Sequence, residues 1–477
     1  MEYQFSDLHF KIFESKKQLN IIKAVAGSGK TTTMIELAKR NKSKKYIYIT
    51  YNTSAANDVS SKGIPNIFAS TFHSIAAKKY LPMYRDKIKD KITIKDVLKT
   101  ISLKINPENV LIARAVLETI NKFQNSDCLK IRDVVKRNLK IPRDTIILYS
   151  EIVWSCMIGV DFDMPCTHDT YLKLFHLNKD IIDGLNIIFD EAQDASNVMI
   201  AILTHQMIVN KTTLFVVGDE NQSIYQFRYS NDAIKAFQSL RFEKEIFYLN
   251  KSYRFGENIS NLANDVLRLK GIDSSIIGSG GTDLLVKKIG VGKKVAIIAR
   301  KNETVFEMAI KTADSGKKMF FIGGFDSYSM SNLSDIENLY LGKRGKIVSQ
   351  DVRDFKSYND FEKMAFSTQD FTMMKLCSIV RSYAGKIDLK IKLIKSNIVN
   401  NVFDAEVILT NAHKSKGLEF DNVYLCNDFK SYYDKNGNKL AITPNHNEEL
   451  NLLYVALTRA KKRLRVNKTL EQIIKNK

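Results

Sequence analysis

A glycine-rich turn near the N-terminus has the residue types that hold a triphosphate. Residues 24–32 read Ala-Val-Ala-Gly-Ser-Gly-Lys-Thr-Thr, after an apolar run at 20–25 that is typical of a strand and before a helical stretch at 32–39. Glycines let backbone N–H groups converge on phosphate oxygens, and a helix N-terminus adds the positive end of its dipole. We therefore predict that Lys30 contacts the β- and γ-phosphates and that the Thr31 hydroxyl holds Mg²⁺. Taken alone, the turn could also join a strand to a helix and bind nothing.

Two adjacent carboxylates follow a second apolar run. Residues 187–189 read Ile-Ile-Phe and lead directly into Asp190 and Glu191. At the end of a buried parallel strand, Asp190 can hold Mg²⁺ through water and Glu191 can polarise the attacking water as general base. An acidic pair on an exposed helix would instead be a solvated face, but the apolar run favours the strand. Together with the glycine-rich turn, the carboxylates predict a site that hydrolyses ATP with Mg²⁺.

The composition indicates a large basic chain. Its 477 residues predict about three or four domains at ~100–200 residues each. The formal net charge of +21 favours polyanionic partners, because Lys and Arg that contact phosphates release counterions. A biased coding composition, rich in Lys, Ile and Asn, is the alternative explanation for that charge.

The cysteines and the apolar runs indicate an intracellular protein. The five cysteines form no C-x-x-C pair and match no zinc-binding spacing, so we expect reduced thiols. No signal peptide is evident, and no apolar run approaches the ~18 residues that a membrane span requires. We therefore expect a protein that is neither secreted nor bound to a membrane.

Short strand-like runs alternate with helical stretches. Residues 46–50, 67–71 and 214–217 predict further strands of the first sheet, which implies a parallel sheet with helices on both faces. Residues 78–150 have helical spacing and predict an insertion. A second α/β unit is predicted to begin near Phe247. Its strands are expected at 294–299, 404–410 and 423–426, with a largely helical segment at 312–399.

Four downstream motifs, in order, resemble a known family. They are residues 218–228 (GDENQSIYQFR), 250–254 (NKSYR), 413–420 (HKSKGLEF) and 453–461 (LYVALTRAK). With the two N-terminal motifs, this ordered set is similar to the superfamily 1 DNA helicases of the UvrD/Rep type, over essentially the whole chain. Residues 51–55, 70–74, 167–174 and 323–324 are most similar to the F-box DNA helicase branch. The glycine-rich turn begins only twenty-odd residues in, so we expect no F-box and no coupling to a ubiquitin ligase.

The resemblance implies an α/β fold with two RecA-like P-loop motor domains, each carrying an inserted, mainly helical subdomain. The implied limits are 1–76 and 150–246 for the first motor domain (1A), 77–149 for its insertion (1B), 247–311 and 400–477 for the second motor domain (2A), and 312–399 for its insertion (2B).

The resemblance also implies roles at the nucleotide. Gln222 would sense the γ-phosphate, and Arg254 and Arg459 would reach it from the second motor domain as arginine fingers. Tyr253 would stack on the adenine and Glu419 would accept from the ribose. With Lys30, Asp190 and Glu191, these residues complete the expected catalytic set. The full set expected at ATP is His9, Ala26, Gly27, Ser28, Gly29, Lys30, Thr31, Thr32, Tyr253, Arg254, Glu419 and Arg459, with Thr31 and Asp190 at the metal.

One position departs from the family pattern. His9 stands twenty-one residues before Lys30, where relatives carry a Gln that reads the adenine edge. A neutral imidazole has one donor and one acceptor on opposite sides of the ring, so it cannot form the same bidentate contact. We predict relaxed selectivity for ATP over other nucleotides.

The resemblance implies a DNA channel lined by aromatic and polar side chains. Aromatic rings stack on bases with little sequence preference. Thr71, Arg228 and Lys414 would contact phosphates, whereas Phe72 could equally belong to the core. Asn411 lies where a Thr is common. The full expected set is Tyr51, Asn52, Thr71, Phe72, His73, Tyr225, Phe227, Arg228, His413 and Lys414.

These features predict an ATP-dependent DNA helicase or single-stranded DNA translocase, moving 3′ to 5′ and acting in repair, recombination or replication. The alternative is a translocase that strips recombinase filaments with little unwinding. A third hypothesis is a degenerate ATPase that only binds DNA, but the complete catalytic set argues against it. The expected partners are single-stranded DNA and its junctions with duplex, with recombinase or replication proteins as candidates, and the expected state is a monomer.

Overall fold

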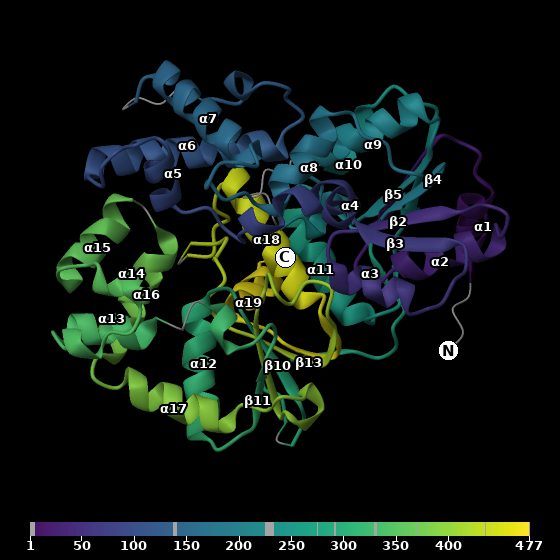
Figure 1. Ribbon diagram of the computed structural model, residues 1–477. Coiled ribbons are helices and arrows are strands. Elements are labelled where there is room, and N and C mark those ends of the chain that lie inside the picture. The colour runs from purple at the N-terminus through teal and green to yellow at the C-terminus, as the bar shows by residue number, and fades with distance from the viewer. Residues whose placement is uncertain are drawn as a thin grey trace. The chain divides into compact units, whose positions relative to one another are not determined.

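Two compact units make up the chain, residues Met1–Asn250 and Lys251–Lys477. The computed structural model describes residues 5–136, 141–224, 233–273, 275–290, 292–328, 332–368, 370–434 and 436–476. Each unit contains a parallel sheet flanked by helices (Figure 1). The predicted α/β class, with two parallel sheets flanked by helices, is therefore confirmed.

The first sheet has six strands in the described part of the unit, all paired in parallel. Two of the strands have the bounds expected from the sequence, since their apolar runs end at polar residues. In spatial order the strands are β3 (Ile67–Thr71), β2 (Tyr46–Thr50), β4 (Asn186–Phe189), β5 (Thr213–Gly218), β1 (Leu19–Ala24) and β6 (Lys244–Leu249).

Strand β6 pairs with β1 in this first sheet. Residues 247–249, which the sequence-based limits assign to the second motor domain, therefore lie in the first sheet. The sequence identified a strand there, but pairing with β1 decides to which sheet it belongs.

Successive side chains of these strands enter two separate cores, one on each face. On β4, Ile187 and Phe189 pack in one core, and Ile188 packs in the other. This alternation follows from the period of two in a strand and explains why the runs are almost continuously apolar. The helices of this unit are α1 (Asp7–Glu14), α2 (Lys30–Arg40), α3 (Thr53–Ser60), α4 (Phe72–Tyr84), α5 (Ile94–Thr100), α6 (Pro107–Asn125), α7 (Arg143–Ile158), α8 (His168–Leu177), α9 (Asn197–Val209) and α10 (Ala233–Ser239).

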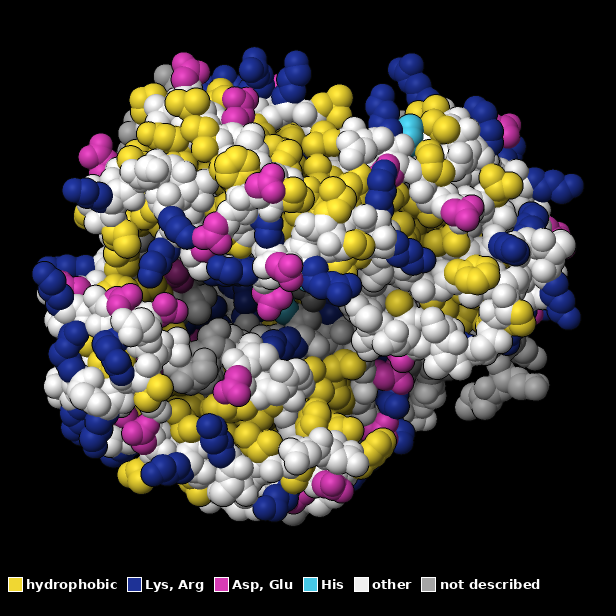
Figure 2. All heavy atoms as spheres, in the orientation of Figure 1, with side chains coloured by type: hydrophobic (Ala, Val, Ile, Leu, Met, Phe, Trp, Pro, Cys, Tyr) yellow, Lys and Arg dark blue, Asp and Glu magenta, His cyan; other side chains and the backbone are white. Residues whose placement is uncertain are grey.

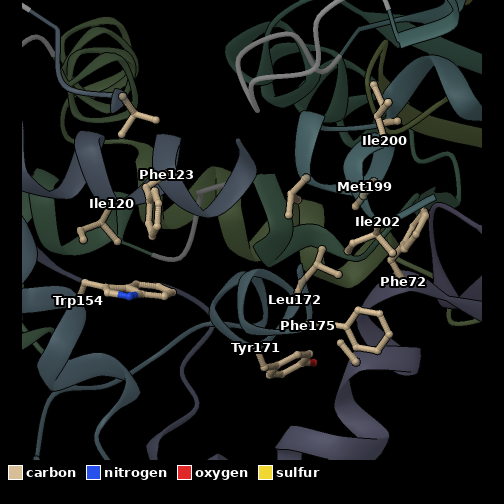
Figure 3. Packing of buried hydrophobic residues seen from close by; sticks show 14 of the residues in the cluster. Phe72, Ile120, Phe123, Trp154, Tyr171, Leu172, Phe175, Met199, Ile200 and Ile202 are labelled. Carbon is tan, nitrogen blue, oxygen red and sulfur yellow. The ribbon is translucent and has the colours of Figure 1, made fainter. Parts of the chain in front are cut away.

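The helical segment expected at 78–150 shares one of those cores. Ile120 and Phe123 on α6 and Trp154 on α7 belong to the same buried cluster as Phe72 and Ile202 (Figure 3). The rings of Phe123 and Trp154 meet edge to face at 5.2 Å. The limits 76/77 and 149/150 fall inside α4 and α7, so continuous helices join this segment to the motor fold.

The second sheet also has six described strands in parallel, ordered β11 (Met319–Phe321), β12 (Val407–Asn411), β10 (Val295–Ala299), β13 (Phe420–Leu425), β14 (Ala460–Arg465) and β9 (Leu284–Val286). Strands β7 (Lys251–Ser252) and β8 (Ile277–Gly278) form a small separate pair. Strand β11 lies within the segment 312–399 that was expected to be largely helical, because three residues are too short for a periodic signal.

Most of the other described residues of that segment are helical. Its helices are α13 (Leu333–Tyr340), α14 (Gln350–Arg353), α15 (Tyr358–Ser367), α16 (Phe371–Tyr383) and α17 (Ile387–Asn397). The sheet is flanked by α11 (Glu257–Leu269), α12 (Asn302–Asp314), α18 (Pro444–Leu457) and α19 (Lys468–Lys475).

The surface carries charge without one dominant patch on the face drawn. Figure 2 shows Lys and Arg side chains spread over both units, with Asp and Glu among them. The distribution of charge therefore does not locate a nucleic-acid site on this face.

Among the helices of the described residues, none combines the length and apolar character needed to cross a membrane.

Candidate nucleotide and DNA site

The phosphate cradle is formed between β1 and α2. Gly27 and Gly29 have φ values of 74° and 78°, in the left-handed region that favours glycine. The Ser28 N–H donates to Val25 O at 3.2 Å, and α2 begins at Lys30 directly after the turn. The turn therefore has the backbone geometry of an anion-binding loop at a helix N-terminus.

The two motifs predicted to act together meet in the first unit. Asp190 follows β4 and is only 4% exposed. The Thr31 hydroxyl donates to Asp190 Oδ2 at 2.9 Å, and the Glu191 N–H donates to Asp190 Oδ1 at 2.8 Å. Lys30 Nζ donates to Val25 O at 3.4 Å. The predicted metal ligands Thr31 and Asp190 are thus in direct contact, one residue from the predicted phosphate-binding lysine.

Burial and charge raise the pKa of Asp190. The largest cause of the rise in pKa is desolvation, followed by the neighbouring Glu191 carboxylate. Hydrogen bonds from Tyr48 and Thr31 oppose the rise. The buried Tyr48 hydroxyl donates to Asp190 Oδ2 at 2.7 Å. The sequence analysis did not assign a role to Tyr48; the signal available was a hydroxyl within a strand that is otherwise buried.

Glu191 is held in an unusual backbone conformation. Its φ of 56° is in the left-handed region, which costs a non-glycine residue about 1–3 kcal/mol and occurs often at functional sites. Gln193 Nε2 donates to Glu191 Oε2, and Gln193 Oε1 accepts from the Asp219 N–H at 3.0 Å. Gln222 Nε2 donates to Asp219 Oδ2 at 2.8 Å. Gln193, also unassigned from the sequence, therefore links the predicted base Glu191 to the region of the predicted sensor Gln222.

These residues fit a magnesium nucleotide. Among the described residues there is no cluster of three or more His, Cys, Asp or Glu that could hold a metal by itself. Mg²⁺ commonly binds through one or two carboxylates together with the phosphates of its nucleotide, and keeps several waters. Thr31 and Asp190 beside the cradle match that donor set.

A second group of predicted residues meets within the second unit. Arg254 Nε donates to Glu419 Oε2 at 3.1 Å, and its Nη1 donates to Thr458 O at 3.1 Å. Arg459 is 1% exposed and donates to Val455 O at 2.8 Å. The main chain thus fixes both guanidinium groups in one small region of this unit.

Two other residues predicted at the nucleotide, Tyr253 and His9, lie in different units. Tyr253 is half-buried in the second unit, with the Lys251 ammonium 5.3 Å from its ring centre. In the first unit, His9 is buried on α1, and burial lowers its pKa. The Ser6 N–H donates to His9 Nδ1 at 3.1 Å, so the proton of the neutral ring is on Nε2.

Several predicted DNA contacts lie at helix N-termini of the first unit. Asn52 caps α3 by accepting from the Ala55 N–H at 2.9 Å, and Thr71 caps α4 by accepting from the Ser74 N–H at 3.0 Å. His73 Nε2 lies 2.8 Å from Asp169 Oδ1 at the start of α8. Tyr51 is half-buried just before α3. Helix N-termini are well suited to phosphate contacts. Asp169 is a further residue to which the sequence gave no role.

Phe72 is a core side chain. It is 3% exposed, and its ring packs edge to face on Phe189 at 5.2 Å. The structure therefore places this ring in the core, which the sequence left open as the alternative to stacking on a base. Tyr225, Phe227 and Arg228 lie outside the described residues.

The predicted DNA residues of the second unit follow β12. Burial and the nearby Arg300 charge lower the pKa of His413 to about 4, so the ring is neutral near pH 7. Lys414 Nζ donates to Ser327 O at 3.0 Å and lies 4.3 Å from the Tyr328 ring centre. Asn411 Oδ1 accepts from the Lys414 N–H at 2.8 Å. Asn411 thus shapes the turn that carries Lys414.

Comparison with known proteins finds one family match in each unit. The AAA domain family matches residues 11–228, and the UvrD-like helicase C-terminal domain matches residues 352–471. The chain is 28% identical to F-box DNA helicase protein 1 of Schizosaccharomyces pombe, over 95% of this chain and 56% of that protein. It is 29% identical to F-box DNA helicase 1 of Gallus gallus, over 96% of this chain and 48% of that protein.

The resemblance to the UvrD-type helicases is confirmed. A further UvrD-type relative, ATP-dependent DNA helicase PcrA of Bacillus subtilis, is 24% identical over 52% of this chain and 37% of that protein. The chain spans about half the length of the two F-box helicases. ATP with Mg²⁺ is the cofactor that the UvrD-type family implies.

Proposed function

We propose that this chain is the motor of an ATP-dependent DNA helicase. The observation that carries the proposal is the hydrogen bond between Thr31 and Asp190, because it joins the phosphate cradle to the carboxylates in one site. In this proposal the first unit binds ATP with Mg²⁺, and single-stranded DNA is the track. Unwinding in the 3′ to 5′ direction, in repair, recombination or replication, follows from the UvrD-type resemblance.

In the proposed mechanism, Mg²⁺ bound with ATP supplies the charge that neutralises the phosphates. The Gly27–Gly29 turn and Lys30 orient the phosphates, while Thr31 and Asp190 hold the metal. Glu191 accepts a proton from the attacking water. Gln193 fixes the direction of the Glu191 carboxylate by donating to Oε2.

Arg254 and Arg459 would complete the site from the second unit. An arginine that stabilises the transition-state charge is worth ~10³–10⁵ in rate. Because these residues belong to the other unit, hydrolysis would require the two units to close on the nucleotide. The cycle of closure and opening would then move the DNA. We extend this proposal to the four-part division of the chain into two motor domains and two helical insertions.

On the DNA side, the proposal places phosphates at the helix N-termini that Asn52 and Thr71 cap. Tyr51 would stack on a base, and His73, held by Asp169 through Nε2, would contact the strand. His413 and Lys414 would provide the contacts of the second unit. Such contacts to sugar, phosphate and base faces accept any sequence, as a translocating motor requires.

The test is the rate of ATP hydrolysis with and without single-stranded DNA. The wild-type chain is expected to hydrolyse ATP faster with DNA, and Lys30→Ala is expected to lose turnover while still binding DNA. Lys42→Ala, at an exposed lysine beyond α2, is the matched control and should behave as wild type. Intact turnover in Lys30→Ala would reject the site.

Tailed duplexes then test the direction of movement. Unwinding of a duplex with a 3′ tail, and not of one with a 5′ tail, is expected. A parallel assay follows removal of recombinase filaments from single-stranded DNA. Efficient filament removal with negligible unwinding would favour the translocase alternative.

A further inference from the structure

A tyrosine hydroxyl reaches the centre of the proposed ATP site from inside the sheet. Tyr48 lies in the middle of β2 and is 0% exposed. It pairs with Ile188 on the neighbouring strand β4, two residues before Asp190. Its hydroxyl donates to Asp190 Oδ2 at 2.7 Å. Tyr48 therefore contacts the carboxylate from within the core of the first unit.

Among the described residues, three hydrogen-bond donors contact the Asp190 carboxylate: one main-chain N–H and two side-chain hydroxyls. The Glu191 N–H holds Oδ1 and is part of the main chain. The Thr31 and Tyr48 hydroxyls both hold Oδ2. Thr31 is itself a proposed ligand of Mg²⁺, whereas Tyr48 is enclosed in the core among β-strand and α2 side chains. Of these two hydroxyls, that of Tyr48 is thus the one that can orient Asp190 without itself binding the metal.

The surroundings of Tyr48 fix its hydroxyl. Its ring belongs to the core that includes Met34 and Leu37 of α2 and Ile188 of β4. Close packing leaves the ring little freedom to rotate. A buried hydroxyl requires a hydrogen-bond partner, and Asp190 provides it. The same core therefore positions the cradle helix and the hydroxyl that holds the carboxylate.

We propose that Tyr48 is a positioning residue that aims the Asp190 carboxylate at Mg²⁺. The proposal rests on the proposed function, since it takes the metal to be bound with a nucleotide at this site. Partners that orient metal ligands commonly contribute 10–100-fold to metal affinity or activity. The hydroxyl of Tyr48 would act in this way, without touching the nucleotide or the metal.

The test compares Tyr48→Phe with Tyr46→Phe. Both substitutions remove one hydroxyl from a buried ring on β2, and Tyr46 lies two residues earlier, at the end of the strand away from Asp190. The readout is the binding of a fluorescent ADP analogue as Mg²⁺ is titrated, with a parallel measurement in EDTA. Tyr48→Phe is expected to need about 10-fold more Mg²⁺ for half of the metal-dependent gain in affinity. Its affinity in EDTA, and both values for Tyr46→Phe, should equal those of wild type.

A second background separates positioning from general damage. In Asp190→Asn, adding Tyr48→Phe is expected to leave the Mg²⁺ dependence unchanged, because the hydroxyl acts through the carboxylate. An unchanged Mg²⁺ requirement in Tyr48→Phe alone would overturn the proposal, as would an equal loss of affinity with and without Mg²⁺. Failure of the proposed function would be distinct, because the wild-type chain would then bind no ADP analogue or hydrolyse no ATP.

Discussion

Replacing the buried Lys173 tests how the helical segment of the first unit is held to the motor fold. Lys173 on α8 is 0% exposed, and its ammonium donates to Ser126 O at 2.7 Å and Cys128 O at 2.6 Å. It also lies 4.4 Å from the Phe123 ring centre. Asp169, the partner of His73, is one helical turn earlier on α8. Lys173→Met would remove the donor from the buried Ser126 carbonyl and from the partly buried Cys128 carbonyl.

The magnitude follows from the pKa of Lys173, which burial lowers from 10.5 to about 8. The folded-state pKa is below the unfolded one, so the unfolded chain binds more protons between these values and stability rises with pH. For this single group the free energy of unfolding should rise by about 2 kcal/mol between pH 7 and pH 10. Met at this position cannot titrate, and an unpaired buried carbonyl costs about 1–3 kcal/mol.

The assay is urea unfolding followed by tryptophan fluorescence. Trp154 is the single tryptophan of the chain and contacts the same Phe123 ring, so it reports on this region. Lys173→Met is expected to be less stable than wild type, and the difference should widen by about 2 kcal/mol from pH 7 to pH 10. Lys130→Met, at an exposed lysine, is the control and should show no such widening. A difference that is the same at both pH values would refute the reasoning.

Four further outcomes are expected. The wild-type chain should hydrolyse GTP at a rate within about ten-fold of that for ATP, because the neutral His9 ring has a single donor, Nε2–H, and both purines have an acceptor at N7. The His9→Gln variant should show a larger preference for ATP. A wild-type enzyme that already rejects GTP would contradict this prediction. Tyr51→Ala should weaken single-stranded DNA binding by about 1–3 kcal/mol in a fluorescence titration. By contrast, Phe72→Leu should lower the unfolding free energy by about 1 kcal/mol or more and leave DNA affinity unchanged, and the reverse pattern would return Phe72 to the DNA channel. Arg254→Ala should slow DNA-stimulated ATP hydrolysis by at least ~10³-fold with little change in ADP binding, whereas a small loss of rate would remove Arg254 from the catalytic set.

The parts of the fold that could be predicted from sequence are those set by local patterns. The strands at Tyr46–Thr50 and Ile67–Thr71 have the predicted bounds, because short runs rich in β-branched and aromatic residues favour strands. The glycine-rich turn was predictable because its backbone conformation demands glycine at positions 27 and 29. Sheet membership was less accessible, since β6 and β11 are placed by their pairing partners and not by their own residues.

Contacts between residues of recognisable motifs could be predicted from the sequence, whereas contacts that depend on packing could not. The contact between Thr31 and Asp190 follows from two motifs that stand 159 positions apart. Tyr48 and Gln193 act through neighbours, so their roles depend on distances that only a fold provides. Phe72, for which the sequence left base stacking and core packing open, shows that an aromatic residue beside predicted DNA contacts can point into the core.

In the proposed function, arginines of the second unit complete the ATP site of the first. The most direct test of this arrangement is a crystal structure of the full chain with single-stranded DNA and a transition-state analogue of ATP hydrolysis. We expect the analogue on the Gly27–Thr31 turn, with the Arg254 and Arg459 guanidinium groups in hydrogen-bond contact with the γ-phosphate position. An analogue bound there with both arginines remote from it would show that these arginines do not complete the ATP site.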